Sequence, residues 1–172
     1  MEIPLNREDL KEDVFAKVSS YLGDLAINTS EVDAERPWGG FFRVADESVE
    51  TFITKYFPDY DRNQIEQFGG KLEPKILVVA PGQMLSWQYH DRRAELWKGV
   101  QGPVGYIRSA DDVQGEVQTL ENGQTVQFDP EERHRLVGLS EWGLVAEIWQ
   151  HTDPQNPSDE NDIVRLQDNY GR

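Results

Sequence analysis

The spacing of hydrophobic residues changes at about residue 70. Before this point, two segments carry apolar residues every three or four positions, which predicts two amphipathic helices. Asn6 can cap the first helix, which is expected to end before Gly23, and Asp46 can cap the second, which Pro58 ends. The apolar faces are Leu10, Val14, Val18 and Leu22 in the first helix and Val49, Phe52, Ile53, Tyr56 and Phe57 in the second. Residues 24–35 are expected to form a polar connector and residues 59–70 a polar loop.

After residue 70 the pattern is typical of a β protein. Short runs rich in β-branched and aromatic residues alternate with turn signals such as Pro81-Gly82 and Asn122-Gly123. These runs cover residues 75–80, 85–90, 95–100, 104–108, 117–120, 125–128, 135–139 and 144–150, and a shorter one precedes them at 41–44. Eight such strands predict a small antiparallel barrel or sandwich, and a closed barrel has an interior that can hold one small ligand. The tail from residue 159 is polar but contains three apolar residues, and it is expected to dock on the barrel.

Composition narrows the class of protein. The chain has 172 residues, 37% of them hydrophobic, which suits one globular domain. We expect residues 1–70 to be an N-terminal extension, 71–151 the barrel core and 152–172 a tail. There are no cysteines, no apolar run of membrane-spanning length and no signal-like start, so a cytoplasmic protein is expected. The net charge of -15 opposes binding to nucleic acid or to an anionic membrane.

Candidate metal ligands lie in the strand after the Pro81-Gly82 turn. Gln88 and His90 are two residues apart, so a strand places them on one face. Glu95 follows on a neighbouring strand, and His134 stands further along the chain. Four oxygen and nitrogen donors suit one borderline divalent metal, with zinc as the first choice and manganese, iron or nickel as alternatives. The opposing interpretation is a polar barrel interior satisfied by hydrogen bonds.

The spacing of these donors resembles the two sequence motifs of the cupins. Gly82, Gln88, His90, Glu95 and Gly102 follow the first motif, with Gln88 where the family usually has His. The segment from Gly123 to His134 resembles the second motif, and it ends on the last ligand. This resemblance implies a mainly β protein, a single cupin jelly-roll barrel, carrying the helical extension described above. Cupins often form dimers, so a homodimer is also expected.

A narrower resemblance runs from residue 36 to the C-terminus. The blocks that resemble the cupin domain of type II mannose-6-phosphate isomerases are Arg36-Pro37-Trp38-Gly39, Lys75, Pro81-Gly82, Leu85 to His90, Arg93-Ala94-Glu95, His134-Arg135-Leu136 and Asp162 to Arg172. Phosphomannose isomerases hold zinc with one Gln, one Glu and two His, which is the set found here. The family has His in place of Leu96 and Asp91, and this difference could alter substrate choice. The guanylyltransferase domain to which such cupins are often fused has no counterpart in this chain.

An isomerase also needs a proton-transfer group and residues that bind its substrate. Glu147, on the predicted strand 144–150, is the first candidate base, and Lys75 is the second. Glu147 can equally be a solvated or hydrogen-bonded strand residue. Arg93 and Arg135 are candidates for binding a phosphate, against the alternative of ion pairs, although strand alternation turns Arg135 outward if His134 faces inward. The third histidine, His151, is expected to lie in a loop, and Asp162, Arg165 and Asp168 are expected to form salt bridges in the tail.

These observations favour a metal-dependent aldose–ketose isomerase acting on a sugar or sugar phosphate. Mannose 6-phosphate and fructose 6-phosphate are the best-supported pair. One alternative is a non-catalytic cupin that binds a sugar or a small anion. Another is a different metal-cupin enzyme, an epimerase or a dioxygenase, the latter favouring iron. The expected partner is a small-molecule sugar or sugar phosphate, and metal analysis with an activity assay would separate the alternatives.

Overall fold

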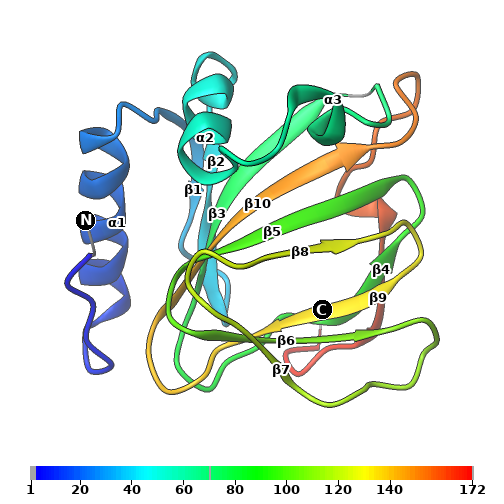
Figure 1. Cartoon of the computed structure of the whole chain (residues 1–172). Helices are drawn as coiled ribbons and strands as arrows, with labels where there is room; N and C mark the ends of the chain where they lie inside the picture. The colour runs from blue at the N-terminus through cyan, green and yellow to red at the C-terminus, as the bar shows by residue number, and fades with distance from the viewer. Residues whose placement is uncertain (1–2, 70, 172) are drawn as a thin grey trace.

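The computed structural model describes residues 3–69 and 71–171 and is built from two facing antiparallel sheets (Figure 1). The strands are β1 (Thr29–Asp33), β2 (Gly39–Val44), β3 (Leu72–Val79), β4 (Trp87–His90), β5 (Arg93–Gln101), β6 (Val104–Ser109), β7 (Gln118–Leu120), β8 (Thr125–Phe128), β9 (Arg133–Val137), β10 (Gly143–His151) and β11 (Ile163–Gln167). The larger sheet has the order β1-β2-β3-β10-β5-β8, and the smaller one has the order β11-β4-β9-β6-β7. Sequence neighbours are therefore often in different sheets, as in a jelly roll.

Helices lie before the main run of strands. They are α1 (Lys11–Asp24), α2 (Val49–Tyr56), which follows a 3-10 turn at Asp46–Ser48, and the short α3 (Arg62–Ile65). A second 3-10 turn, Glu160–Asp162, precedes β11. The apolar faces of α1 and α2 pack against the outer face of the larger sheet, where Phe15 stacks on Phe42 with ring centroids 5.2 Å apart. Among the described residues, no helix is long and apolar enough to cross a membrane.

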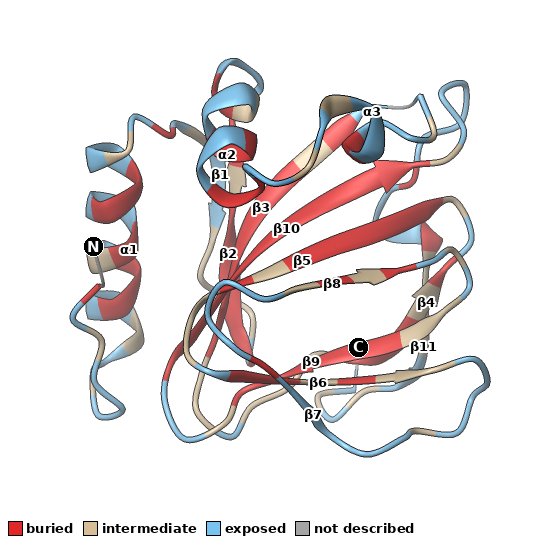
Figure 2. Ribbon diagram, viewed as in Figure 1, coloured by how far each residue is buried: buried red, intermediate tan, exposed pale blue. Residues whose placement is uncertain are grey.

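The larger sheet is buried on both faces because the helices cover one side and the smaller sheet covers the other. Every residue of β10 is buried, which explains its nearly continuous apolar sequence (Figure 2). Its side chains alternate: Ala146 and Ile148 join the helix-facing core, whereas Val145 packs between the sheets. The inter-sheet core consists of Trp38, Phe41, Leu77, Val79, Trp97, Val104, Leu120, Val126, Phe128, Leu136 and Val145. Polar side chains on the same inward-facing side of these strands form the site described below.

The predicted fold class, a mainly β jelly roll with a helical N-terminal region, is confirmed. All eight predicted strands are present, and the tail docks as β11 against β4. Within the described residues, two elements were not predicted. The supposed connector contains β1, a polar edge strand paired only with β2, and the supposed loop contains α3, which begins with a capping box formed by Asp61 and Gln64.

The first helix begins later than predicted. The Asn6 amide donates to the Asp9 carboxylate at 2.8 Å, so this pair closes a turn ahead of the helix instead of capping it. Helix α1 starts at Lys11, and Leu10, assigned to its apolar face, is exposed. The prediction for His151 was also wrong: it is the last residue of β10 and is buried, because the strand extends one residue beyond the predicted range.

Candidate metal centre and cavity

Three buried side chains from three strands meet between the sheets. His90 ends β4, Glu95 lies on β5 and His134 lies on β9, and their potential ligand atoms are all within 4.8 Å of one another. Each is at most 2% exposed. Gln88 lies directly opposite His134 in the pairing of β4 with β9, and it is two residues from His90, so it shares their face. The strand register therefore places Gln88, His90 and His134 on the inner face of the smaller sheet, and Glu95 meets them from β5 of the larger sheet, which is not the neighbour of β4.

One hydrogen bond determines which ring nitrogen of His134 carries a proton. Its Nδ1 lies 2.9 Å from the Glu132 carbonyl oxygen, which can only accept, so Nδ1 carries the proton. The Nε2 atom is left with a lone pair, is buried, and has no hydrogen-bond partner among the described residues. It lies 3.2 Å from Glu95 Oε2. A cation placed between these two buried atoms would satisfy both of them.

His90 lies against the other carboxylate oxygen of Glu95. Its Nε2 atom lies 3.1 Å from Glu95 Oε1 and 3.1 Å from Arg93 Nη2, which can only donate. Burial lowers the pKa of His90 to about 4 despite the neighbouring carboxylate, so the ring is neutral. Burial opposes ionisation of Glu95, yet His90, Arg93 and His134 hold its pKa well below the usual value. A neutral His90 imidazole and an ionised Glu95 carboxylate are protonation states that metal binding requires.

These residues therefore fit a divalent metal ion: His90, Glu95 and His134 can hold one. Gln88 is suited to add a fourth donor. Its side-chain oxygen accepts a hydrogen bond from Ser86 Oγ at 2.6 Å, which orients the amide, and a carbonyl oxygen keeps a second lone pair for a ligand. Oxygen and nitrogen donors of this kind suit zinc, manganese, iron or nickel.

The two candidate bases lie side by side on the larger sheet. In the strand register, Glu147 of β10 is opposite Lys75 of β3 on one side and opposite Trp97 of β5 on the other. Burial raises the pKa of Glu147 to about 8, and the Glu95 carboxylate adds to this shift. Burial also lowers the pKa of Lys75 to about 8, although the Glu147 carboxylate opposes that shift. Both groups can therefore exchange a proton near neutral pH.

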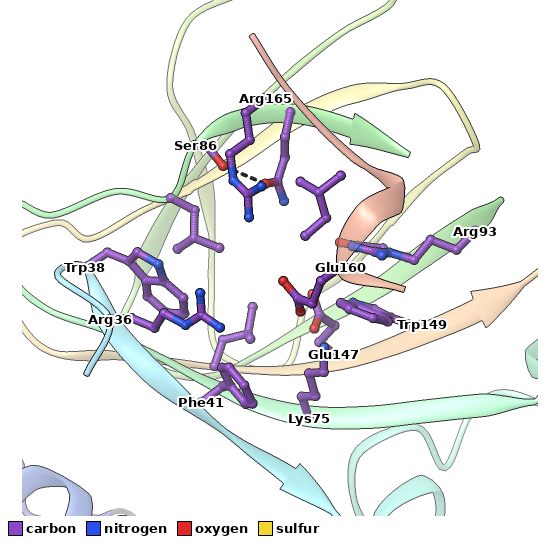
Figure 3. Close-up of a pocket in the computed structure, with 15 residues that line it drawn as sticks. Arg36, Trp38, Phe41, Lys75, Ser86, Arg93, Glu147, Trp149, Glu160 and Arg165 are labelled. Carbon is purple, nitrogen blue, oxygen red and sulfur yellow. Dashed lines mark hydrogen bonds and ion pairs between the residues drawn. The ribbon is translucent and has the colours of Figure 1, made fainter. Parts of the chain in front are cut away.

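A cavity lies beside the metal-type site (Figure 3). Gln88, Glu95, Glu147 and Lys75 all contribute to its wall. The remaining lining residues are Arg36, Trp38, Phe41, Leu77, Leu85, Ser86, Arg93, Trp149, Glu160, Ile163 and Arg165. A polar end formed by donors and charged groups therefore meets an aromatic and aliphatic wall, as is common for sites that bind small molecules.

The two arginines predicted to bind phosphate have different surroundings. Arg93 lines the cavity, but its guanidinium donates to Glu95 Oε1 at 2.8 Å and to Ser158 Oγ at 2.9 Å, and it stacks on Trp149. Arg135 is not part of the cavity wall. Because it follows the inward-facing His134, strand alternation places it on the other face, where it donates to the Leu85 carbonyl at 2.9 Å.

Arg36, Glu160 and Arg165 were not proposed from the sequence as site residues, yet all three line the cavity. Arg36 precedes β2, and Arg165 lies on β11 opposite Gln88. Arg165 forms no side-chain hydrogen bond or ion pair within the described part of the chain, so its predicted salt bridge is absent there. The only sequence signal for the two arginines was their place in the blocks on which the expected isomerase resemblance rested.

Leu96 marks another difference from the sequence-based interpretation. It is fully buried in the core between the larger sheet and the helices, on the face opposite Glu95. A histidine at this position would not reach the cavity from the present backbone. The residue at position 96 is therefore a packing residue in this fold, and its difference from the family motif does not change the site directly.

The two sheets and the site define a protein with the cupin jelly-roll fold and a set of residues suited to a metal. No family model matches the sequence. Oxalate decarboxylase from Bacillus subtilis has 14% identity, with 81% of this chain and 30% of that chain covered and a TM-score of 0.56. Vicilin from Corylus avellana has 11% identity, with 78% and 35% covered and a TM-score of 0.52. At these identities the likeness concerns the fold alone.

The sequence itself is similar to a curated protein. The xanthan biosynthesis protein XanB of Xanthomonas campestris pv. campestris (strain B100) is 31% identical over 130 residues, which cover 74% of this chain and 26% of the relative. XanB from a second strain matches equally well. The alignment thus spans about a quarter of the length of these curated relatives.

Proposed function

We propose that the protein is a metal-dependent aldose–ketose isomerase that acts on a sugar or sugar phosphate, with mannose 6-phosphate and fructose 6-phosphate as the favoured pair. The observation that carries the proposal is the position of Glu147. Its carboxyl group lines the same cavity as Glu95 and Gln88, so a proton-transfer group stands beside the candidate metal ligands. The relation to a protein of xanthan biosynthesis supports sugar chemistry, because xanthan is a polysaccharide.

The metal would be held by Gln88, His90, Glu95 and His134. Once bound, it would supply Lewis-acid stabilisation of the negative charge that develops on the sugar oxygens at C1 and C2. Zinc is the first choice, since two imidazoles, a carboxylate and an amide oxygen form a donor set that it accepts.

The remaining chemistry belongs to residues of the chain. In its ionised form, Glu147 takes the proton from C2 of the open-chain aldose and returns it to C1, and a hydroxyl proton moves from O2 to O1, so atoms and charge balance. Lys75, opposite Glu147 in the sheet, is the second candidate for this transfer. The aromatic groups Trp38 and Phe41 form an apolar wall that limits access of water to the reacting carbons.

We further propose that the protein works in the cytoplasm and that the sugar is its partner in the reaction. The net charge of -15 opposes a role on nucleic acid or on an anionic membrane. Four basic and three acidic side chains line the cavity, which leaves a place where a small anion can bind despite the acidic net charge.

The direct test measures metal content and isomerisation together. The protein is analysed for bound metal as purified, then assayed for conversion of mannose 6-phosphate to fructose 6-phosphate before chelation, after chelation and after metal is restored. We expect activity to disappear and return with the metal, and Glu147→Gln to abolish it while retaining the metal. Bound metal without turnover of any aldose phosphate would favour the sugar-binding module instead. Full activity in the metal-free protein would reject the mechanism.

A further inference from the structure

Two arginine side chains point into the mouth of the cavity from opposite sides (Figure 3). Arg36 belongs to the turn before β2 in the larger sheet, and Arg165 belongs to β11 in the smaller sheet. The residues are far apart in sequence, and the packing of the C-terminal strand on β4 brings Arg165 to the site. Their convergence at one opening is a property of the folded protein.

Arg36 is held in place but keeps free donors. Its Nε atom donates to Asp33 Oδ2 at 2.7 Å, and its guanidinium lies 5.7 Å from the centre of the Phe41 ring. No described residue accepts a hydrogen bond from its two terminal nitrogens. The Asp33 contact thus fixes the direction of the fork while leaving its end available to a ligand.

The Arg165 side chain has no hydrogen-bond or ion-pair partner among residues 3–69 and 71–171. Its Nε atom is buried and makes no hydrogen bond with any described residue, although a buried guanidinium nitrogen normally has an acceptor. Its backbone pairs with Gln88, a candidate metal ligand on the adjacent strand. Adjacent strands lie about 5 Å apart, so an anion held by Arg165 would be within the length of a small sugar from the metal-type site.

A carboxylate stands in the same opening. Glu160, in the turn before β11, lines the cavity with the two arginines, and its charge acts on Lys75. Glu160 is exposed and forms no ion pair with either arginine. An incoming anion would meet the Arg165 guanidinium, the free end of the Arg36 guanidinium, whose Nε is paired with Asp33, and one repelling carboxylate.

We propose that Arg36 and Arg165 form a phosphate-binding subsite at the mouth of the cavity, and that the Glu160 carboxylate weakens anion binding there. This inference rests on the proposed function, and it identifies the substrate as a phosphorylated sugar. A tetrahedral phosphate accepts hydrogen bonds from several directions, which suits forks that approach from two sheets, whereas a planar carboxylate is matched by one fork. Arg36 and Arg165 replace Arg93 and Arg135 as the proposed phosphate-binding residues, because Arg93 and Arg135 donate hydrogen bonds to other groups of the protein.

The test measures binding of inorganic phosphate by calorimetry, with the metal-loaded and the chelated protein compared in parallel. We expect phosphate to bind both forms, and Arg36→Gln or Arg165→Gln to weaken binding about tenfold or more, the usual cost of losing a charged hydrogen bond. Arg165→Lys, which keeps the charge but lacks the fork, should give an intermediate affinity. Glu160→Gln, an exposed change, should tighten binding. Arg62→Gln is the matched control, because Arg62 lies on α3 in ion pairs with Glu50 and Glu66.

Several results would overturn the subsite. These are no phosphate binding by the wild-type protein, equal affinity in all arginine variants, or binding that depends on the metal and not on the arginines. Kinetic measurements distinguish failure of the phosphate subsite from failure of the proposed isomerase function. If the arginine variants raise KM for mannose 6-phosphate and leave kcat nearly unchanged, both stand. Arginine-dependent phosphate binding without turnover would remove the isomerase and keep the subsite, whereas unaltered turnover in both variants would remove the subsite alone.

Discussion

Glu95 and Glu147, on the neighbouring strands β5 and β10, accept hydrogen bonds from the same N–H group. The shared donor is Trp97 Nε1, which lies 3.1 Å from Glu95 Oε2 and 3.0 Å from Glu147 Oε1. The indole therefore links a candidate metal ligand to the candidate base. A single donor between two buried carboxyl groups stabilises their ionised forms and fixes the distance between them.

Replacing the shared donor should impair proton transfer more than folding. In Trp97→Phe the ring volume is largely kept, but both carboxyl groups lose the indole N–H. We expect kcat for isomerisation to fall about tenfold or more, since hydrogen bonds to charged groups contribute about 1.5–3 kcal/mol. The pKa of Glu147 should rise further, so the ascending limb of the pH–rate profile should move to higher pH.

Trp87→Phe provides the control for this experiment. Trp87 is also buried and also uses its indole N–H, but the acceptor is the Asp112 carbonyl at 2.9 Å, outside the site. The control should lose a similar amount of stability without a shift in the pH–rate profile. If both variants changed the profile equally, the link between Glu95 and Glu147 would have no role in the reaction.

The histidines give a clear prediction for metal binding. His134→Ala or Gln88→Ala should lose metal and activity together, whereas His151→Ala should retain the metal, because His151 Nδ1 accepts from the Ser158 amide outside the donor set. Metal analysis after gel filtration would separate the variants. Wild-type protein should also gain about 2.7 kcal/mol of stability when free metal is 100 times its Kd, and His134→Ala should gain none. Metal retained by His134→Ala would remove His134 from the donor set.

Much of the site could be predicted from the sequence because its chemistry is local in the strands. Gln88 and His90 share a face by the two-residue period, and the same period indicated that Arg135 would face away from His134. The position of Glu147 depended on the register of three strands, which the sequence does not reveal. Only the fold places Glu147 between Lys75 and Trp97.

The elements that were missed have physical reasons. Strand β1 is polar and mostly exposed because it is an edge strand, so it has no apolar alternation to detect. Helix α3 has four residues, too few for a periodic pattern, although the Asp61 and Gln64 capping box could have indicated it. Arg36 and Arg165 meet only because the C-terminal strand returns to the cavity, and no local pattern reports a contact over that separation.

Leu96 provides a test of the two-sided burial of the larger sheet. Leu96→Ala should lower the free energy of unfolding by about 2–5 kcal/mol, because it leaves a space between the sheet and the helices. Its metal content and KM should stay close to wild type, since its side chain points away from Glu95. Urea unfolding with metal analysis would check both statements. A marked loss of metal at unchanged stability would place residue 96 in the site.

The pH dependence of stability should reveal the buried Glu147 carboxyl group. Its pKa is raised from 4.5 to about 8, so between these values the folded state binds more protons than the unfolded state. Stability contributed by Glu147 is therefore complete below pH 4.5 and is lost as the pH rises toward 8. His90 acts in the opposite direction between about pH 4 and 6.5, because its pKa is lowered, and its effect is complete above that range. The decline should be clearest between pH 6.5 and 8.

Urea unfolding of chelated protein across this range would measure the effect. In wild-type protein, stability should fall from pH 6.5 to 8 and then rise toward pH 10.5, where the lowered pKa of Lys75 makes the unfolded state bind more protons. Glu147→Gln should flatten the fall, and the exposed Glu141→Gln should leave it unchanged. The difference between wild type and Glu147→Gln isolates one carboxyl group from the others that titrate. If that difference were constant with pH, Glu147 would be ionised throughout, and the proton-transfer role would pass to Lys75.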